Sequence, residues 1–153
     1  MLFRSNLLAE KAGKAYDDKG MMASSGKIIQ PLLNELNAPA YYQQSYPKSL
    51  SNQFGLDNIL PILSNSADSL ADLLCTYTEH VAIQIGNAFA PFINASENNN
   101  NILVTGGGAF NDYLIERIQH HLPTAAITLP NNQIIQYKEA LIMALLEIGR
   151  AHV

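Results

Sequence analysis

Three consecutive glycines, Gly106-Gly107-Gly108, follow the apolar run from Ile102 to Thr105 and precede Asn111. The β-branched run favours a strand, and Asn111 is a typical N-cap for a helix that begins at Asp112. Where a strand turns into a helix over residues without side chains, the backbone is open to a ligand. Phosphates and nucleotides bind such turns, because backbone N–H groups and the helix dipole favour anions. The glycines alone also fit a flexible turn, so both interpretations stay open.

The composition limits the classes of protein to which the chain can belong. Its 153 residues suffice for one domain with a core, and 48% hydrophobic against 14% charged residues is typical of a packed globular protein. A net charge of −4 and a pI of about 5.4 argue against a nucleic-acid-binding surface. No apolar run reaches the roughly 18 residues of a membrane span, and the single cysteine, Cys75, fits a reducing compartment. We therefore expect a cytoplasmic protein that binds neither nucleic acid nor membrane.

The two ends of the chain differ in character from the rest. Residues 2–5 and 147–153 resemble in-frame translations of sequencing-adapter DNA, and such segments are left out of fold reasoning. We expect residues 1–5 and 147–153 to be artefactual. The evolved unit then spans residues 6–146 as a piece truncated at both ends.

The clearest helical pattern lies between residues 67 and 89. Its apolar residues recur at three- and four-residue steps and form one face. They are Leu70, Leu73, Leu74, Tyr77, Val81 and Ile85. Cys75 lies inside this pattern and is expected to be an inert core thiol. Weaker patterns predict helices over residues 28–36 and 56–63.

The last third of the chain alternates between strand and helix patterns. Residues 102–105 and 125–129 are predicted strands, and residues 112–122 and 136–146 are predicted helices. Such a β-α-β-α unit pairs its strands in parallel through a right-handed crossover. Ligands of parallel sheets bind beyond the carboxyl ends of the strands, which is where the glycines lie.

Two nucleotide-binding signatures are incomplete. Ser25-Gly26-Lys27 does not end a P-loop, because Met21 stands where the first glycine is required. The triple glycine does not complete the dinucleotide fingerprint, because Asn111 stands where the third spaced glycine belongs. These departures argue against two classes of protein, the P-loop enzymes and the Rossmann dehydrogenases.

Three polar groups have a structural interpretation beside a functional one. His120 and His121 point about 100° apart on a helix, so we expect surface residues near its C-terminus rather than a metal site. Asp17-Asp18 is expected to cap a solvated turn rather than to bind Mg²⁺. Glu139 lies near the start of the last predicted helix, where the dipole stabilises a carboxylate. It is either a first-turn acid or a carboxylate that faces a ligand, and its position alone does not separate the two.

Four short sequence segments, here called islands, resemble in the same order segments of the anhydro-N-acetylmuramic acid kinase family. The members of this family are sugar kinases of the actin/hexokinase-like superfamily. The islands are Tyr16-Asp17-Asp18-Lys19-Gly20 with Ala23-Ser24-Ser25-Gly26, Pro47-Lys48-Ser49 with Phe54, Thr105 to Asn111, and Lys138-Glu139-Ala140. One departure is that Ser51-Asn52-Gln53 replaces a Gly-Arg-Glu segment of the family. The roles of that arginine and glutamate are therefore not carried over.

The resemblance implies an α/β fold, the C-terminal lobe of a two-lobed, ribonuclease H-like kinase with a mixed sheet flanked by helices. It implies ATP-dependent phosphorylation of 1,6-anhydro-N-acetylmuramic acid at O6, with hydrolytic opening of the anhydro ring, in the recycling of cell-wall amino sugars. The family's phosphate loop and catalytic aspartate would precede residue 6, so the fragment alone is expected to be inactive. Mg²⁺ would be held mainly by that missing part, and the full-length protein is expected to form a homodimer.

The resemblance also implies roles for individual residues. Gly106, Gly107 and Gly108 would lie against the adenosine and inner phosphates of ATP, and Asn111 would cap the helix and contact the nucleotide. Glu139 would act as a catalytic residue that holds the sugar or the attacking water. No metal ligand is assigned to this chain. Two alternatives stay open: a non-catalytic remnant that serves as a folding or dimerising unit, and a related kinase with another sugar substrate.

Overall fold

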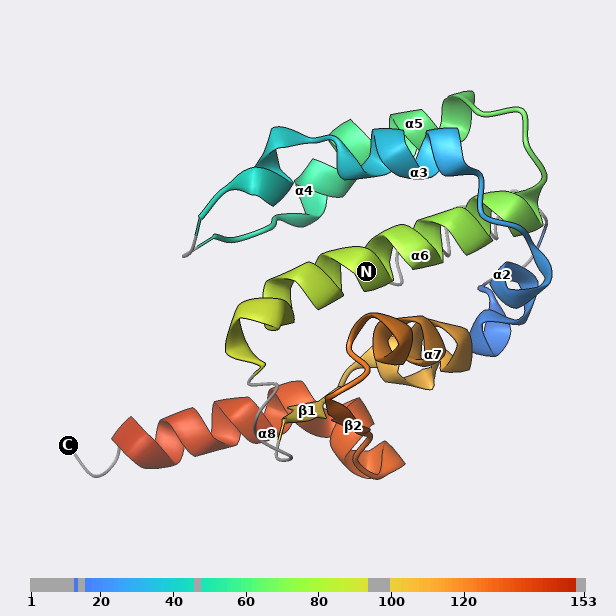
Figure 1. Ribbon diagram of the computed structural model, residues 1–153. Helices are drawn as coiled ribbons and strands as arrows, with labels where there is room; N and C mark the ends of the chain where they lie inside the picture. Colours follow the sequence, from blue (N-terminus) through green and yellow to red (C-terminus); the bar gives the residue numbers. More distant parts are fainter. Residues whose placement is uncertain (1–12, 14–15, 46–47, 94–99, 151–153) are drawn as a thin grey trace.

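The computed structural model describes residue 13 and residues 16–45, 48–93 and 100–150. Residues 1–5 and 151–153, which belong to the ends that we expect to be artefactual, lie outside this part of the chain, as does Pro47. Helices predominate, with two short strands near the C-terminus (Figure 1). The elements are α2 (Met21–Ser25), α3 (Gln30–Asn37), α4 (Asn52–Phe54), α5 (Leu60–Asn65), α6 (Leu70–Phe89), β1 (Asn101–Leu103), α7 (Asp112–His121), β2 (Ala126–Thr128) and α8 (Asn132–Arg150).

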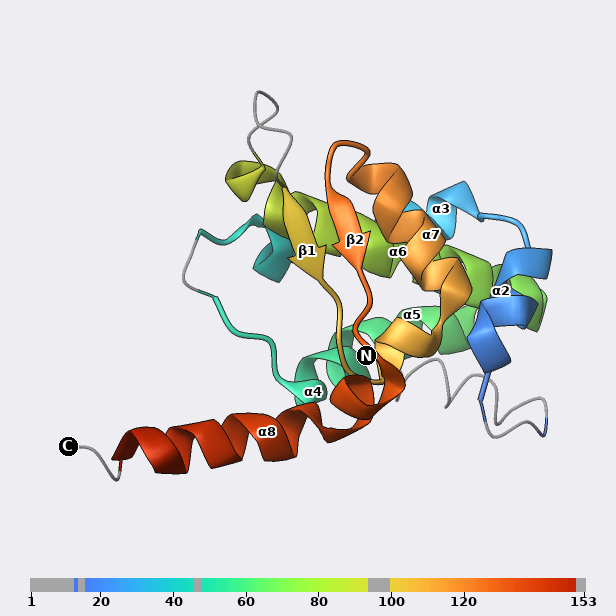
Figure 2. The same cartoon turned by 90° about the horizontal axis from the view of Figure 1, so that it is seen from below.

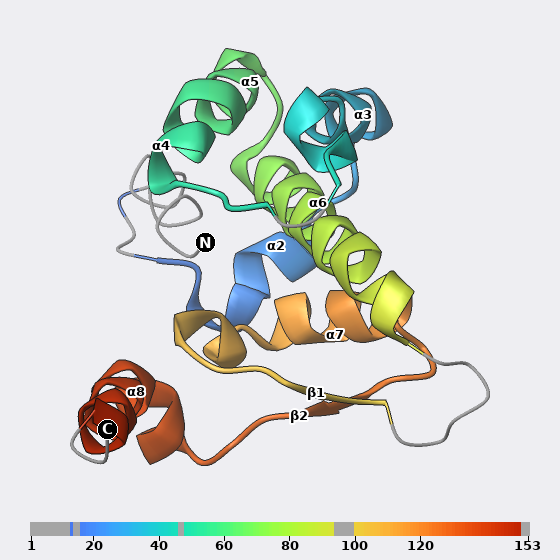
Figure 3. The same cartoon turned by 90° about the vertical axis from the view of Figure 1, so that its left-hand side faces the viewer.

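Helix α6 is the centre of the fold. It begins where Ser69 Oγ accepts a hydrogen bond from Asp72 N (3.2 Å), and its residues 73–82 are all buried. Helices α3 and α5 lie on one side of α6, and α2 and α7 lie on the other (Figures 1 and 3). A helix that is covered on both sides needs apolar residues around most of its circumference, and the sequence of α6 supplies them. The helix predicted over residues 67–89 is confirmed, with its start at Leu70.

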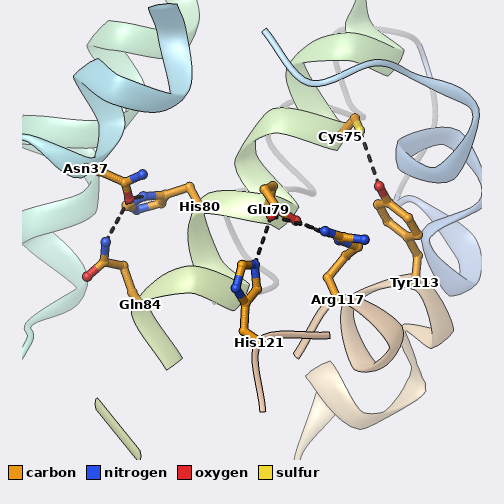
Figure 4. A network of polar contacts seen from close by, with 8 residues as sticks. All are labelled: Asn37, Cys75, Glu79, His80, Gln84, Tyr113, Arg117 and His121. Carbon is orange, nitrogen blue, oxygen red and sulfur yellow. Dashed lines mark hydrogen bonds and ion pairs between the residues drawn. The ribbon is translucent and has the colours of Figure 1, made fainter. Parts of the chain in front are cut away.

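Polar contacts between side chains fasten α6 to α3 (Figure 4). His80 Nδ1 donates to Asn37 Oδ1 (2.7 Å), and Gln84 Nε2 donates to the same oxygen (2.7 Å). His80 Nε2 lies 3.1 Å from the hydroxyl of Tyr42, so both ring nitrogens have partners. Because His80 is only 3% exposed, these bonds offset the cost of burying its polar ring.

The two strands form a parallel sheet, with Asn101 opposite Ala126 and Leu103 opposite Thr128. Helix α7 connects the strands and packs between the sheet and α6 (Figure 3). The predicted β-α-β-α unit and its parallel pairing are thus confirmed. The expected α/β class is confirmed, although most of the regular structure is helical and the sheet is small. The mixed sheet that the resemblance implies is not present among the described residues, where the sheet consists of β1 and β2 alone.

Helix α8 extends away from the body of the protein (Figures 1 and 2). It is longer than the predicted 136–146, because Asn131 Oδ1 accepts a hydrogen bond from Ile134 N (3.0 Å) and caps an earlier start. Of its described side chains only Ile135 is buried, while eight large apolar ones are exposed. These are Ile134, Tyr137, Leu141, Ile142, Met143, Leu145, Leu146 and Ile148. Neither α8 nor any other described helix is long and apolar enough to cross a membrane.

Candidate functional site

A pocket of about 690 Å³ lies where three segments of the chain meet. The first is the turn at residues 16–19, the second is the glycine turn with residues 107 and 109–112, and the third follows β2, at residues 129–136. The first and third sequence islands, which are about 90 residues apart in the chain, are therefore brought together in one wall. The third segment continues from the carboxyl end of β2, as expected for a parallel sheet.

Asp17 fixes the first segment. Its side chain is 8% exposed, with Oδ1 accepting from Met22 N (2.8 Å) and Oδ2 accepting from Ala23 N (3.0 Å). The expectation that this aspartate caps a turn is confirmed, but its expected solvation is wrong, because both oxygens are used at the start of α2. Asp18 stays exposed in the pocket wall. Next to it, Lys19 pairs with Asp112 across the pocket (3.7 Å), with both side chains mostly exposed.

Asn111 joins the first segment to the glycine turn. Its Oδ1 accepts from Leu114 N (2.9 Å), so the predicted cap of α7 is confirmed. The same oxygen lies so close to Gly20 that a Cβ there would be 2.3 Å away, and Gly20 has a φ of +77°. Asn111 is 7% exposed and lines the pocket. Within the described part of the chain, no group accepts a hydrogen bond from its amide nitrogen.

The glycine turn is an ordered 3₁₀ turn at Gly107–Phe110. Two hydrogen bonds close it, from Ala109 N to Gly106 O (2.9 Å) and from Asn111 N to Gly108 O (3.1 Å). In the regions that the structure describes, neither the N–H of Gly107 nor that of Gly108 donates to a protein acceptor. Gly107 is exposed in the pocket wall, while Gly106 and Gly108 flank it. The geometry offers two backbone donors beside a preformed pocket, which suits an anionic or polar ligand.

Glu139 occupies a different place from the one expected. Helix α8 begins at Asn132, so Glu139 comes seven residues later and is not in the first turn. The interpretation of Glu139 as a first-turn acid is therefore wrong. Its side chain lies outside the described part of the structure, and its proposed catalytic role stays a prediction.

The sequence assigned no role to several residues that line the pocket. Tyr16 and Phe110 supply aromatic surface, and Leu129, Pro130 and Ile135 supply aliphatic surface. The signal that could have found the last three is their position directly after the second strand, at the edge where the glycines also lie.

A cluster of three charged or ionisable side chains anchors α7 to α6 (Figure 4). Glu79 is 5% exposed and accepts from Arg117 Nε (2.6 Å), Arg117 Nη2 (3.2 Å) and His121 Nε2 (2.8 Å). Burial raises the pKa of the Glu79 carboxyl, but the hydrogen bonds from Arg117 and His121 outweigh it and hold the pKa below its ordinary value of 4.5. The same bond to Glu79 raises the pKa of Arg117.

The expectation of two surface histidines is confirmed for His120 and wrong for His121. Gly86 of α6 leaves room for the end of α7, since a Cβ there would lie 3.0 Å from His121 Cβ. This close approach places the imidazole of His121 against Glu79. Nearby, the Cys75 thiol lies 3.3 Å from the hydroxyl of Tyr113 (Figure 4), and burial and then this contact raise the pKa of Tyr113. Cys75 is buried, as predicted.

The lowered pKa of Glu79 has a consequence for stability in acid. A carboxyl group whose pKa is lower in the folded state stabilises the fold above its unfolded pKa, and this contribution is lost as the pH falls through the folded value. We expect the chain to lose stability below about pH 4.5 partly through Glu79. To check this, the unchanged chain and the Glu79→Gln variant are unfolded with urea at a series of pH values from 7 to 3. The gap in unfolding free energy between the two proteins should shrink over this window, and a constant gap would contradict the prediction.

No group of three or more His, Cys, Asp or Glu side chains is arranged to hold a metal ion in the described part of the chain. The pocket wall instead combines aromatic and aliphatic surface with a few polar groups, and its volume lies in the range of about 300–1,000 Å³ that small-molecule sites have. Its chemistry therefore suits the binding of an organic ligand.

Comparison with known proteins gives one consistent result. The sequence model of the family "Anhydro-N-acetylmuramic acid kinase" matches residues 2–152. A protein of that name from Aliivibrio fischeri is 34% identical over 148 residues, which are 95% of this chain and 40% of the relative. The one from Psychrobacter arcticus is 41% identical over 122 residues, covering 74% and 28%, and the one from Synechococcus elongatus is 34% identical over 143 residues, covering 90% and 37%. The chain spans two fifths or less of the length of these relatives.

Proposed function

The chain belongs to the anhydro-N-acetylmuramic acid kinase family, and we propose that its pocket receives the nucleoside end of ATP. In this proposal the chain is part of the C-terminal lobe of a two-lobed, ribonuclease H-like kinase. The base and ribose lie in the pocket, against Gly107 and Asn111. The inner phosphates follow the backbone of the glycine turn.

The observation that carries this proposal is the combination of Gly107 and Asn111 in one preformed wall. Gly107 brings bare backbone to the pocket, and the amide nitrogen of the buried Asn111 has no acceptor among the described residues. A buried polar group without a partner costs free energy, so a hydrogen-bonding ligand beside it would be stabilised. Tyr16 and Phe110 supply the aromatic surface that a purine ring favours.

For the full-length kinase we propose phosphorylation of 1,6-anhydro-N-acetylmuramic acid at O6, coupled to hydrolytic opening of its anhydro ring. The names of the relatives support the sugar, since each is described as a kinase of anhydro-N-acetylmuramic acid. This chain would contribute nucleotide binding, and its 153 residues alone would not turn the sugar over. A cytoplasmic location, proposed together with this activity, agrees with the buried free thiol of Cys75.

A kinase of this type uses ATP with a divalent cation. The pocket, with its aromatic surface and the amide nitrogen of Asn111, fits the nucleoside. The described residues do not fit a protein-held cation, because no cluster of metal-binding side chains is present among them. We therefore propose that Mg²⁺ arrives on the phosphates of ATP and that other parts of the full-length kinase hold it.

The Gly107→Val variant tests the nucleotide pocket. Gly107 is exposed and its φ is not in the left-handed region, so the fold should tolerate a side chain there. The isopropyl group would cover the backbone that the nucleotide contacts, and we expect ATP to bind at least about tenfold more weakly. Isothermal titration calorimetry of ATP measures the effect. Ser45→Val, which adds valine to an exposed loop outside the pocket, should leave the affinity unchanged. Equal affinities of the unchanged chain and Gly107→Val would refute the site.

A further inference from the structure

We propose that Lys138 is a phosphate-binding residue, whose ammonium group holds the polyphosphate of a nucleoside di- or triphosphate at the far end of the glycine turn. This inference rests on the proposed function and adds to it the orientation of the bound nucleotide. The uncharged base and ribose occupy the pocket, and the phosphates leave the pocket toward α8.

The first support is the position of the ammonium group. Lys138 Nζ lies 3.7 Å from the point where a Cβ of Gly106 would stand, so the lysine head is directly beside the bare α-carbon of that glycine. Gly106 has a φ of +78°, a conformation that side chains rarely adopt, and this keeps the surface next to the ammonium clear. A residue from α8 thus reaches the same turn that presents the unused N–H groups of Gly107 and Gly108.

The second support is the charge of Lys138 and the lack of a counter-ion for it. The lysine is half-buried, and no ion pair or hydrogen bond joins it to the described residues. Two other cations, Lys19 in the pocket wall and Arg117 on α7, are engaged, since Lys19 pairs with Asp112 and Arg117 pairs with Glu79. An ammonium group has three hydrogen-bond donors, and one without a counter-ion on a half-buried residue favours an anionic ligand. Lysine is a frequent phosphate-binding residue in proteins.

The third support is the distribution of charge around the pocket. The pocket wall contains three aspartates, Asp17, Asp18 and Asp112, and one lysine, Lys19. The net negative charge of this wall repels phosphate groups, and the exposed carboxylate of Asp18 can accept hydrogen bonds from ribose hydroxyls or base amines. Lys138 is not part of the wall, and its ammonium group lies beside Gly106, which does not line the pocket either. The charges therefore favour one orientation of a nucleotide, with its neutral end inside and its phosphates at Lys138.

The test compares ligands that differ only in phosphate content. Adenosine, AMP and ADP are titrated by calorimetry into the unchanged chain and into Lys138→Met, which keeps the apolar stem and removes the charge. We expect ADP to bind Lys138→Met about tenfold more weakly, because a charge-assisted hydrogen bond is lost, and adenosine to bind both proteins equally. Lys138→Arg should retain most of the ADP affinity. Lys27→Met removes one positive charge from an exposed loop outside the pocket and should change neither affinity.

The outcomes separate the inference from the proposed function. If adenosine and ADP bind the unchanged chain but Lys138→Met binds ADP as tightly as the unchanged chain does, the role of Lys138 is refuted. The proposal that the pocket binds a nucleotide is then still supported. If the unchanged chain binds neither ligand, the nucleotide pocket and the role of Lys138 are both refuted. If the Lys138→Met substitution weakens the binding of adenosine as much as the binding of ADP, Lys138 supports the fold of the pocket and does not bind phosphate. Circular dichroism and thermal melting of each variant show whether α8 is intact.

Discussion

The Glu79→Ala variant is expected to unfold with a free energy about 3 kcal/mol below that of the unchanged chain. Glu79 is nearly fully buried between α6 and α7 and accepts three hydrogen bonds from Arg117 and His121. Its removal leaves the guanidinium group without a counter-charge in a partly buried position, since the Arg117 side chain is only 20% exposed. Urea denaturation at pH 7, followed by far-ultraviolet circular dichroism, measures the loss.

Two control variants isolate the effect of the buried charge. Glu35→Ala removes an exposed carboxylate from α3 and should change the unfolding free energy by no more than about 0.5 kcal/mol. Adding Arg117→Ala to Glu79→Ala should recover part of the loss, because the unpaired guanidinium group is then gone. A loss for Glu79→Ala as small as that for Glu35→Ala would show that the ion-pair cluster does not hold α7 in place.

The Gly20→Ala variant is expected to lose about 2–4 kcal/mol of stability and to weaken nucleotide binding as well. Gly20 has a φ of +77°, so any side chain is strained there. A Cβ would also lie 2.3 Å from Asn111 Oδ1 and 2.8 Å from Tyr113 Cβ. The collision would move Asn111, which caps α7 and lines the pocket. We therefore expect the free energy of unfolding and the affinity for ATP to decrease together. Thermal unfolding and ATP calorimetry measure the two effects.

Gly13→Ala is the matched control for this variant. Gly13 has a φ of +70°, similar to that of Gly20, but no described atom lies within 4 Å of its Cβ position. We expect it to cost only about 1 kcal/mol, which is the backbone strain without the collision, and to leave ATP binding unchanged. If both alanine variants lost the same stability, the contact between Gly20 and Asn111 would not restrain the pocket.

Local patterns in the sequence predicted the elements that carry the site. The period of apolar residues identified α6 and α7, the β-branched run identified β1, and Asn111 was recognised as a cap from its place before α7. Each of these signals acts within about four residues, so no knowledge of distant contacts was needed. The parallel pairing of β1 and β2 followed because a helix connects them.

The predictions that were wrong depend on contacts between distant parts of the chain. His121 was expected at the surface, but its partner Glu79 lies 42 residues away, and only the packing of α7 on α6 brings them together. Asp17 was expected to be solvated, and its burial depends on the packing of α2 against α6 and α7. The start of α8 was misplaced because the polar residues that precede it are typical of a loop, although Asn131 acts as a cap. The nucleotide-binding roles assigned to Gly106, Gly107, Gly108 and Asn111, and the catalytic role of Glu139, stay predictions.

Helix α8 has a mechanical consequence. A helix of 19 residues is a stiff rod roughly 28 Å long, and its first turn lines the pocket while its other end lies far from the body of the protein (Figure 2). Ile135 is buried where the helix meets the pocket, whereas every residue from 140 to 148 is exposed. The pocket therefore depends on the first turns of the rod, and substitutions in its outer half should leave the pocket wall unchanged.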